Sequence, residues 1–506
     1  MLQSLAEILP KASQEFGEKL ALVINNEEFT YSQLDKLSNQ LANGLRDLGV
    51  RESDRVTLYS PNSWQWLVSY YAILKLGAVV NPVNMMLTPD EIRFIVRDAD
   101  VRMVIASKEK GMALLSQGIT EELDHLVMFG EGLPEGATNF DSLIDQSSGN
   151  FIPPKISTDS LSTICYTSGT TGTPKGAMLS HKAVLMNTEM TALMHGTTST
   201  DTVVSALPCP HVYGNVVMNS CLLFGGTLVL LPAFKEEIVL DLIQRYRATK
   251  FEGVPTMYMY LLNYPDTKAA DFSSLRICTV GGQTMPQAKM EAVEQVFGCP
   301  LIELWGMTEI GGLGTTFAWS GPRKLGSIGT ALPYLRVKIV DAQDSNLEMP
   351  EGDVGELLVK GPMVMMGYFG NEHATRETID VHGWLRTGDL ARIDSDGCVY
   401  VVDRKKDMII TAGFNIYPAE LERVIAAHPD VALVAVGAIY DEDKGQLPKA
   451  YIVPTAGAAC SKEDILTHCR THLAAYKVPR SVQFVEELPR TSTGKIMRRR
   501  LQQLDD

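Results

Sequence analysis

Residues 166–176 read YTSGTTGTPKG, and this stretch of glycines and hydroxyl residues says most about the fold. An apolar run typical of a buried strand, Leu161–Tyr166, precedes it, and a helix is predicted to begin after Ser180. We therefore expect a strand-to-helix turn in which backbone N–H groups and hydroxyls bind phosphate oxygens, with Lys175 as a point charge. The stretch is not a P-loop, because a proline precedes its lysine and a glycine follows it.

Strands and helices alternate through the first four hundred residues. Thr30–Gln33 predicts a capping box that opens an amphipathic helix through Leu45, and Thr88–Glu91 predicts a second capping box with proline at the first helical position. The short apolar runs Arg55–Tyr59 and Arg102–Ala106 are suited to buried strands. This repeat predicts an α/β fold with doubly wound parallel sheets.

The pattern changes after Leu335 to short strands separated by turns, which predicts a small antiparallel barrel or hairpin unit. These strands are expected at Arg336–Asp341, Val354–Lys360 and Cys398–Val402. A compact block follows Asp403, and a separate α+β domain of about a hundred residues fits it. Its helices and strands are expected at Pro418–His428, Val431–Ile439, Ser461–Leu473 and Ser481–Glu487.

Composition narrows the class of protein. The 506 residues allow several structural units, and 45% hydrophobic with 21% charged residues is typical of a soluble globular protein. A net charge of -15 disfavours binding to nucleic acid or to anionic membrane surfaces. The basic run Lys495–Arg500 is either a solvated tail or part of a phosphate site.

Two further absences in the sequence bear on location and metal content. No secretory signal or membrane span is predicted, because the longest apolar stretch, 216–234, is broken by a glycine pair, so we expect a cytoplasmic protein. The eight cysteines have no C-x-x-C spacing and no histidine cluster beside them. Neither a zinc site nor a disulfide framework is therefore predicted, and reduced thiols are expected.

Several motifs stand in one order along the chain, which resembles the acyl-adenylate-forming superfamily of acyl-CoA synthetases, nonribosomal adenylation domains and luciferases. The resemblance covers essentially the whole sequence and looks closest to CoA ligases for medium- or long-chain fatty acids or aryl acids. It rests on YTSGTTGTPKG at 166–176, PHVYG at 210–214, GGQTM at 281–285, WGMTE at 305–309, GWLRTGDL at 383–390, DRKKDMIITAGFNIYPAELE at 403–422 and PRTSTGK at 489–495.

The resemblance implies an architecture and a reaction. Residues 1–405 are expected to form two doubly wound subdomains plus a small β-barrel, and residues 406–506 a mobile α+β domain. The implied activity is an AMP-forming acid–thiol ligase of fatty acid metabolism, which uses ATP and Mg²⁺ and takes coenzyme A as acceptor. Its partners are then small molecules, and the chain is expected to be a monomer or a homodimer.

The resemblance also assigns the nucleotide site. Glu309 is expected to hold Mg²⁺, Thr308 to contact the α-phosphate, and the ring of Trp305 to stack on adenine. The family usually has tyrosine at this last position, so the phenolic hydrogen bond is expected to be lost. Asp389 is expected to accept hydrogen bonds from both ribose hydroxyls, with Arg404 as its partner. The predicted ATP-binding set is completed by Thr167, Ser168, Gly169, Thr170, Thr171, Gly172, Lys175, Gly281, Gly282, Gln283, Gly306 and Met307.

The catalytic and acyl-transfer positions follow from the same resemblance. Lys495 is expected to bridge the substrate carboxylate and the α-phosphate, on a domain that turns about Lys406. Fixed positive charge there stabilises the transition state in which two anions approach. No general base is required, because a carboxylic acid is already ionised at neutral pH. His211 is expected to line and gate the acyl pocket, and Gly413 and Phe414 to line a tunnel for the pantetheine arm.

Outside their motifs these residues have plainer interpretations. His211 alone would be taken for a core histidine, Asp389 with Arg404 for a structural salt bridge, and Glu309 for an exposed carboxylate. The segment 212–219 carries no arginine or lysine, so an apolar aliphatic, cyclic or aromatic acid is favoured over a dicarboxylate. The adenylation motifs also serve enzymes that pass the acyl group to an amine or a carrier-protein thiol, so an amide-forming ligase is the alternative.

Overall fold

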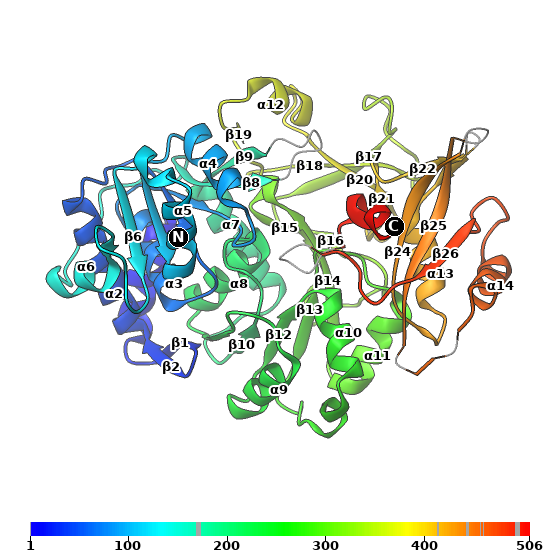
Figure 1. The fold of residues 1–506 in the computed structure, drawn as a ribbon, viewed down its shortest axis with the longest axis horizontal. Coiled ribbons are helices and arrows are strands. Elements are labelled where there is room, and N and C mark those ends of the chain that lie inside the picture. The colour runs from blue at the N-terminus through cyan, green and yellow to red at the C-terminus, as the bar shows by residue number, and fades with distance from the viewer. Residues whose placement is uncertain are drawn as a thin grey trace.

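The computed structural model describes residues 2–167, 174–411, 414–441, 445–455, 457–458, 460–490 and 496–505. Within these residues the strands form four sheets, three in a large N-terminal part and one in a smaller C-terminal lobe (Figure 1). No helix in these ranges combines the length and the apolar character that crossing a bilayer requires. Seven predicted site residues lie outside the described residues: Ser168, Gly169, Thr170, Thr171, Gly172, Gly413 and Lys495.

The first sheet is mainly parallel, and in the described chain it has nine strands. In spatial order these are β16 (Thr330–Ala331), β15 (Gly312–Thr316), β14 (Leu301–Met307), β13 (Ile277–Val280), β12 (Lys250–Gly253), β10 (Thr202–Ser205), β11 (Thr227–Leu230), β1 (Leu20–Ile24) and β2 (Glu27–Thr30). Its helices are α1 (Ile8–Phe16), α8 (Val212–Leu223), α9 (Glu236–Arg245), α10 (Pro255–Asn263) and α11 (Gln287–Phe297).

The second sheet is again mainly parallel and has eight strands among the described residues. In spatial order these are β19 (Gly367–Tyr368), β9 (Lys175–Ser180), β8 (Leu161–Thr167), β4 (Val79–Pro82), β3 (Arg55–Tyr59), β5 (Met103–Ser107), β6 (His125–Phe129) and β7 (Thr138–Asn139). Its helices are α2 (Tyr31–Asp47), α3 (Trp64–Lys75), α4 (Pro89–Asp98), α5 (Lys108–Ser116), α6 (Phe140–Gln146) and α7 (His181–Met194). The two doubly wound sheets are as predicted.

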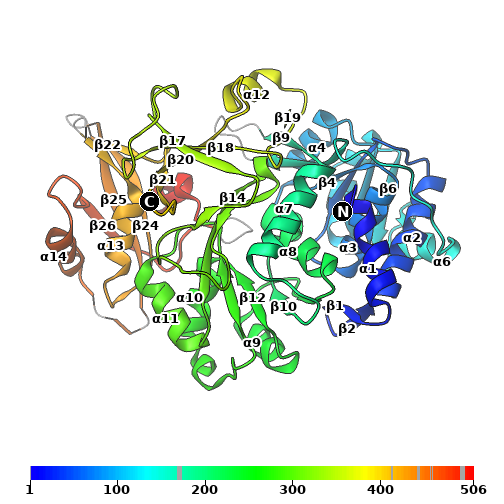
Figure 2. The same cartoon turned by 180° about the vertical axis from the view of Figure 1, so that it is seen from behind.

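Helices α7 and α8 lie between the two sheets (Figure 2). Helix α7 packs on β8 and β9 of one sheet and on β15 of the other, and α8 packs on β11 and β15. Both helices are largely buried, and α8 carries almost no polar face. The two sheets therefore share a large hydrophobic core, and separate smaller clusters also include residues of each sheet.

Two helix starts confirm the capping boxes expected from the sequence. Thr30 Oγ1 accepts from the Gln33 backbone N–H at 3.2 Å, and Gln33 Oε1 accepts from the Thr30 N–H at 2.8 Å. Thr88 and Glu91 make the same reciprocal pair at the start of α4. Each pair satisfies backbone donors that a helix N-terminus leaves without partners, and this sets where α2 and α4 begin.

The glycine- and hydroxyl-rich stretch joins two strands, so the expected strand-to-helix turn is wrong. β8 and β9 pair antiparallel, with Thr167 opposite Lys175, and α7 begins only after β9. Gly176 allows this pairing to be close, because a Cβ there would lie 2.8 Å from the Ile164 side chain. The residues that flank the predicted phosphate loop, Thr167 and Lys175, therefore belong to paired strands, and residues 168–173 lie outside the described residues.

The expected small antiparallel unit is a four-stranded sheet, and in the described chain its strands pair in a row as an open sheet, not as a closed barrel. Its strands are β17 (Arg336–Val340), β18 (Gly355–Lys360), β20 (Leu385–Ile393) and β21 (Val399–Arg404), and α12 (Glu372–Thr378) precedes β20. β20 and β21 form a hairpin that ends beside the small lobe (Figure 1).

The small lobe is an α+β unit with a hydrophobic core of its own. Its sheet comprises β23 (Phe414–Ile416), β22 (Ile409–Thr411), β25 (Gly445–Pro454), β24 (Val431–Asp441) and β26 (Ser481–Phe484). Helices α13 (Pro418–Ala426) and α14 (Lys462–His472) pack together. Short 3-10 helices are found at η1 (Leu5–Glu7), η2 (Ile119–Glu122), η3 (Pro265–Ala269), η4 (Thr308–Ile310) and η5 (Arg498–Leu504).

Candidate active site

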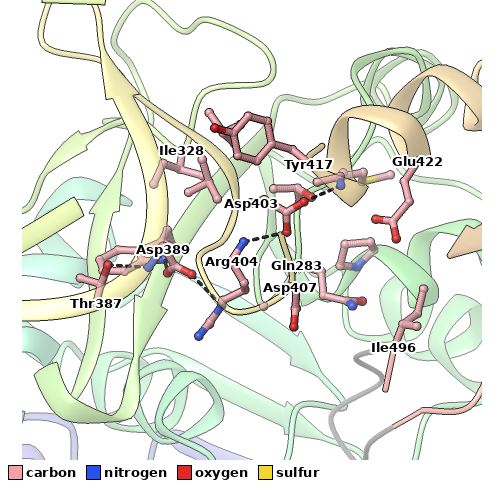
Figure 3. A pocket seen from close by; sticks show the side chains of 18 of the residues that line it. Gln283, Ile328, Thr387, Asp389, Asp403, Arg404, Asp407, Tyr417, Glu422 and Ile496 are labelled. Atoms are coloured by element: carbon pink, nitrogen blue, oxygen red, sulfur yellow. Dashed lines mark hydrogen bonds and ion pairs between the residues drawn. The ribbon is translucent and has the colours of Figure 1, made fainter. Parts of the chain in front are cut away.

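A cavity of about 1680 Å³ opens between the large part and the small lobe, and Figure 3 shows side chains that line it. The end of β14, η4, the β20–β21 hairpin, α10 and α13 all contribute to its wall. Of the predicted site residues, those that line it are Thr167, Lys175, His211, Gly282, Gln283, Trp305, Gly306, Met307, Thr308, Glu309, Asp389, Arg404 and Lys406. Motifs spread over some two hundred and forty residues of sequence thus meet at one cavity.

Asp389 is the centre of one polar group in this wall. It lies opposite Arg404 in the β20–β21 ladder, and its Oδ1 is 2.6 Å from Arg404 Nε. Its Oδ2 accepts from the indole Nε1–H of Trp305 at 2.8 Å. A carboxylate has about four lone-pair positions, so it can accept more hydrogen bonds than these two. The side chain of Asp389 is buried and held in place from both sides.

The indole of Trp305 makes a hydrogen bond of its own. The sequence predicted only that the family's phenolic hydrogen bond is lost, and in this chain the indole Nε1–H donates to Asp389. Its six-membered ring fits because residue 314 is glycine, where a Cβ would lie 2.4 Å from Trp305 Cζ3. Trp305 therefore lines the cavity while its indole is hydrogen-bonded to the carboxylate of Asp389.

Glu309 lies in a second polar group of the wall. It is buried, and its Oε1 accepts from the Tyr368 hydroxyl at 2.9 Å. Burial raises the pKa of Glu309 above its ordinary value. The ammonium of Lys175 lies 5.4 Å from the centre of the Tyr368 ring. A buried carboxylate is a ligand that suits a hard divalent cation, and the lysine ammonium in the same cavity wall can pair with phosphate oxygens.

Tyr368 was not singled out from the sequence, although it positions Glu309. It lies in β19, which pairs with β9, so the strand that begins at Lys175 also brings Tyr368 to the site. The sequence separation of 59 residues between Tyr368 and Glu309 left no local signal of this contact.

The turn from β14 into η4 sets the positions of Thr308 and Glu309. A Cβ on Gly306 would lie 2.1 Å from the Gly312 carbonyl oxygen, so only glycine allows β14 and β15 to come this close. The Glu309 carbonyl accepts from the Met365 N–H at 2.8 Å, which anchors the short helix. Thr308 is half-buried and faces the cavity beside Glu309.

Gly281 and Gly282 occupy different places. Gly282 lines the cavity with a backbone φ of +90°, a left-handed conformation that favours glycine. Gly281 is absent from the described cavity wall, and a Cβ there would lie 2.2 Å from Leu304 Cδ1. The missing side chain at 281 therefore makes room for Leu304, whereas Gly282 and Gln283 form the wall.

Glu303 is a further residue that the sequence analysis missed. It lines the cavity on β14, and its Oε2 has no hydrogen-bond partner among the described residues. Burial raises its pKa to about 8, partly offset by a hydrogen bond from the Met285 backbone. A charged residue within the otherwise apolar run Leu301–Leu304 was the available signal. An orphaned acid facing a cavity is unusual for a purely structural residue.

His211 caps the N-terminus of α8, where its Nδ1 accepts from the Tyr213 N–H at 3.2 Å. The Tyr213 hydroxyl lies 2.6 Å from Thr279 Oγ1 and 3.3 Å from a carboxylate oxygen of Glu252. Glu252 is buried, and desolvation raises its pKa. His211 therefore lines the cavity, and the buried polar group of Tyr213, Thr279 and Glu252 lies next to it inside the core. The residues of α8 itself do not line the cavity.

The junction between the large part and the small lobe lies at the same cavity. Asp403 accepts from the Ala419 N–H of α13 at 2.7 Å, and burial raises its pKa to about 6 (Figure 3). Arg498 pairs with Glu422 at 2.6 Å and with Asp407 at 3.2 Å. Lys406, the predicted hinge, is exposed and lies in the turn between Asp403 and Asp407.

The two residues predicted to line a pantetheine tunnel are Gly413 and Phe414. Phe414 begins β23 and pairs with Thr411 of β22, and the structure describes only its backbone. The position of Gly413 lies outside the described residues. Their role in a pantetheine tunnel stays a prediction.

The residues gathered at this cavity are those expected of an adenylate-forming enzyme, and comparison with known protein families gives the same class. The model of the family described as AMP-binding enzyme matches residues 9–369, and that of the AMP-binding enzyme C-terminal domain matches residues 420–495. The chain belongs to this family of adenylate-forming enzymes.

Individual relatives narrow the comparison. The chain is 33% identical to the long-chain-fatty-acid–CoA ligase of Bacillus subtilis strain 168 over 529 residues, which cover 99% of this chain and 94% of that protein. It is 35% identical to a feruloyl-CoA synthase of an Amycolatopsis species over 473 residues, which cover 93% and 92%. A crystal structure of an anthranilate CoA ligase in complex with anthranoyl-AMP is similar with a TM-score of 0.93 and 29% identity, covering 99% of this chain and 97% of that one.

Proposed function

We propose that the protein is an AMP-forming acid–CoA ligase. The carboxylate of an acid attacks the α-phosphorus of ATP, a bond forms between them, and pyrophosphate leaves. The thiol of coenzyme A then attacks the carbonyl carbon of the acyl-adenylate, and AMP leaves as the thiol proton passes to solvent. The observation that carries this proposal is one cavity whose wall holds the Asp389–Arg404 pair together with Glu309 and Lys175.

The first group would bind the nucleoside. Asp389 offers two acceptor oxygens, oriented by its contacts with Trp305 and Arg404, which suits the two hydroxyls of a ribose. The Trp305 ring offers an aromatic surface to adenine. Glu303 lies two residues before Trp305 on the same strand, on the same face.

The carboxyl group of Glu303 has a donor and an acceptor that can pair with those on one edge of adenine. With a pKa near 8, its side chain is a neutral carboxylic acid at pH 7, with an O–H donor and a C=O acceptor. Adenine presents an amino donor next to a ring-nitrogen acceptor. Two antiparallel hydrogen bonds would then pair Glu303 with the base and satisfy its orphaned Oε2.

The second group would bind the phosphates. Thr308 and Lys175 donate to phosphate oxygens, and Glu309 provides the carboxylate for Mg²⁺. Mg²⁺ when bound neutralises charge on the phosphates and on the departing pyrophosphate. Tyr368 fixes the orientation of Glu309 through its hydroxyl.

Lys495 is proposed as the charge that stabilises the transition state. Ile496, the next residue, lines the cavity, and Arg490 on the other side of the segment donates to the Tyr260 hydroxyl of α10. Of the two residues that flank segment 491–495, one lines the cavity and the other contacts the large part, which supports a role in adenylation. We place the domain boundary between residues 405 and 406, so that residues 406–506 move together about Lys406.

Coenzyme A is the favoured acceptor because each relative compared above is named as a CoA ligase or CoA synthase. No contact described at the cavity favours an amine acceptor. The thiol is expected to reach the adenylate past Gly413, where a glycine permits close approach.

The acid is proposed to be apolar. Tyr213 lies 3.5 Å from the Gly253 carbonyl, so the start of α8 adjoins the start of α10, where Pro255, Thr256 and Met259 line the cavity without charge. The buried Glu252 would offer a second substrate carboxylate no attraction, and burying an unpaired charge costs several kcal/mol. Each buried methylene gains about 0.8 kcal/mol.

A screen tests the proposal. The protein, ATP and Mg²⁺ are mixed with acids of graded length and ring content, with coenzyme A or hydroxylamine as acceptor, and pyrophosphate is counted. Pyrophosphate release with an apolar acid, and an acyl-CoA product in mass spectrometry, are expected. Release with no acid would overturn the enzymatic proposal, and malonate or succinate as the best substrate by kcat/KM would overturn the apolar one.

A further inference from the structure

Three side chains of metal-ligating type meet in the small lobe, outside the cavity. A ring nitrogen of His428, a carboxylate oxygen of Asp430 and the Sγ of Cys460 all lie within 4.8 Å of one another. We propose that these three residues bind a zinc-type divalent transition-metal cation.

The fold creates this group from two distant segments. Helix α13 ends at Ala426, and the chain turns through His428 and Asp430 into β24. Cys460 directly precedes the capping box of Ser461 that starts α14. Because α13 and α14 pack together, the end of one helix meets the beginning of the other. The sequence analysis predicted no zinc site, since thirty residues separate Cys460 from Asp430 and no short metal spacing is present.

The donor set decides the class of cation. Imidazole nitrogen, carboxylate oxygen and thiolate sulfur together suit Zn²⁺ and similar borderline ions, whereas Mg²⁺ and Ca²⁺ prefer oxygen alone. Nδ1 of His428 accepts from the Asp430 backbone N–H at 3.2 Å, so its lone pair is engaged, and a cation bound at this nitrogen would displace that hydrogen bond. Binding would release the Cys460 thiol proton to solvent as the metal–sulfur bond forms. Three protein ligands leave a fourth tetrahedral position for water.

Neighbouring imidazoles hold the group in place. The ring of His468 meets that of His428 edge to face at 5.3 Å, and its Nε2 lies 3.0 Å from the Val424 carbonyl oxygen. The ring of His472 lies 4.5 Å from that of His468. All eight cysteines are free thiols, and seven are buried while Cys460 is half-buried. A cation from solvent can therefore reach this sulfur more readily than the others.

The place of His428, Asp430 and Cys460 in the small lobe indicates that a cation bound there would stabilise the lobe. Helix α13 lines the cavity from Ala419 to its last residue, Ala426, whereas His428 lies in the turn that follows. None of the three proposed ligands lines the cavity. A bound cation would tie the α13–β24 turn to the start of α14 and stabilise the small lobe without entering the active site.

The test uses the full-length protein, freed of metal by a chelator and then titrated with Co²⁺ or Zn²⁺. The expected result is one Co²⁺ per chain, with tetrahedral d–d absorption and a near-ultraviolet thiolate charge-transfer band. Zn²⁺ should displace the Co²⁺ and raise the unfolding temperature. Cys460→Ser should abolish the charge-transfer band and weaken Zn²⁺ binding by more than about 100-fold, beyond the cost of losing an outer-shell partner.

Matched variants make the result specific. His428→Asn should weaken binding like Cys460→Ser, whereas Cys398→Ser, a change at a cysteine outside the group, should bind as the wild type does. Circular dichroism checks that each variant is folded, and pyrophosphate release should persist in Cys460→Ser. Sub-stoichiometric Co²⁺ without a charge-transfer band would overturn the proposal, and so would equal binding by the wild type, Cys460→Ser and His428→Asn.

Discussion

Replacing Asp389 with asparagine tests the nucleoside end of the cavity. The carboxylate accepts from two donors at once, Trp305 Nε1–H at 2.8 Å and Arg404 Nε–H at 2.6 Å. An asparagine has one accepting oxygen, so its NH₂ group must face one of these donors. One existing hydrogen bond is then lost, and one of the two acceptors proposed for the ribose disappears with it.

The size of the effect follows from the type of bond. A hydrogen bond to a charged group is worth about 1.5–3 kcal/mol, and its loss corresponds to about a 10- to 150-fold change in an equilibrium constant. The Arg404 side chain is 45% exposed, so solvent screens its pairing with Asp389 and favours the lower half of this range. We therefore expect the KM for ATP to rise by about 10- to 50-fold in Asp389→Asn, with little change in the KM for the acid.

Initial rates of pyrophosphate release measure both constants. The control is Asp394→Asn, which changes an aspartate of the same hairpin that pairs with Lys324 and does not line the cavity. That variant should keep the wild-type KM for ATP. An unchanged KM for ATP in Asp389→Asn, or an equal rise for ATP and acid, would refute the assignment.

Four further outcomes are expected, at Glu303, Glu309 and Gly413. The neutral acid of Glu303 is lost as pH rises through about 8, so the KM for ATP should increase above pH 8 in the wild type and stay flat in Glu303→Gln. Between the unfolded pKa of Glu303 and pH 8, the folded protein keeps a proton on Glu303 that the unfolded chain has lost. The free energy of unfolding should therefore fall as pH rises through this range, and Glu303→Gln should not show this fall. The Glu309→Gln variant should require more Mg²⁺ to reach half its maximal rate and should adenylate about 100-fold more slowly than the wild type. Because the Tyr368 hydroxyl only orients Glu309, Tyr368→Phe should show both effects more weakly. Gly413→Leu should leave acid-dependent pyrophosphate formation intact and slow thioester formation from supplied acyl-adenylate, and equal loss in both would contradict the tunnel assignment.

Local signals in the sequence were sufficient for much of the fold. Capping at Thr30 and Thr88 is decided by residues three apart, and the structure has both boxes. The hairpin after Thr167 was missed because pairing with β8 is a long-range effect, and the segment 175–180 has no strict alternation that would mark a strand.

The site shows the same division. Asp389, Arg404 and Trp305 were identified because each belongs to a motif, yet their mutual contacts follow only from the fold. Glu303 lies outside any motif, and its importance depends on being buried at a cavity without a partner. Tyr368 likewise gains a role only because β19 lies next to β9.

The two half-reactions of Lys495→Ala test the central claim most directly. Removing this charge should slow adenylation from acid and ATP by about 10²–10³-fold, the scale of a preorganised electrostatic group. The variant should still convert supplied acyl-adenylate and coenzyme A to thioester at close to the wild-type rate, because the proposed hinge at Lys406 moves the lysine away for that step. Equal loss of both rates in a folded variant would contradict the account of an adenylating lysine on a moving domain.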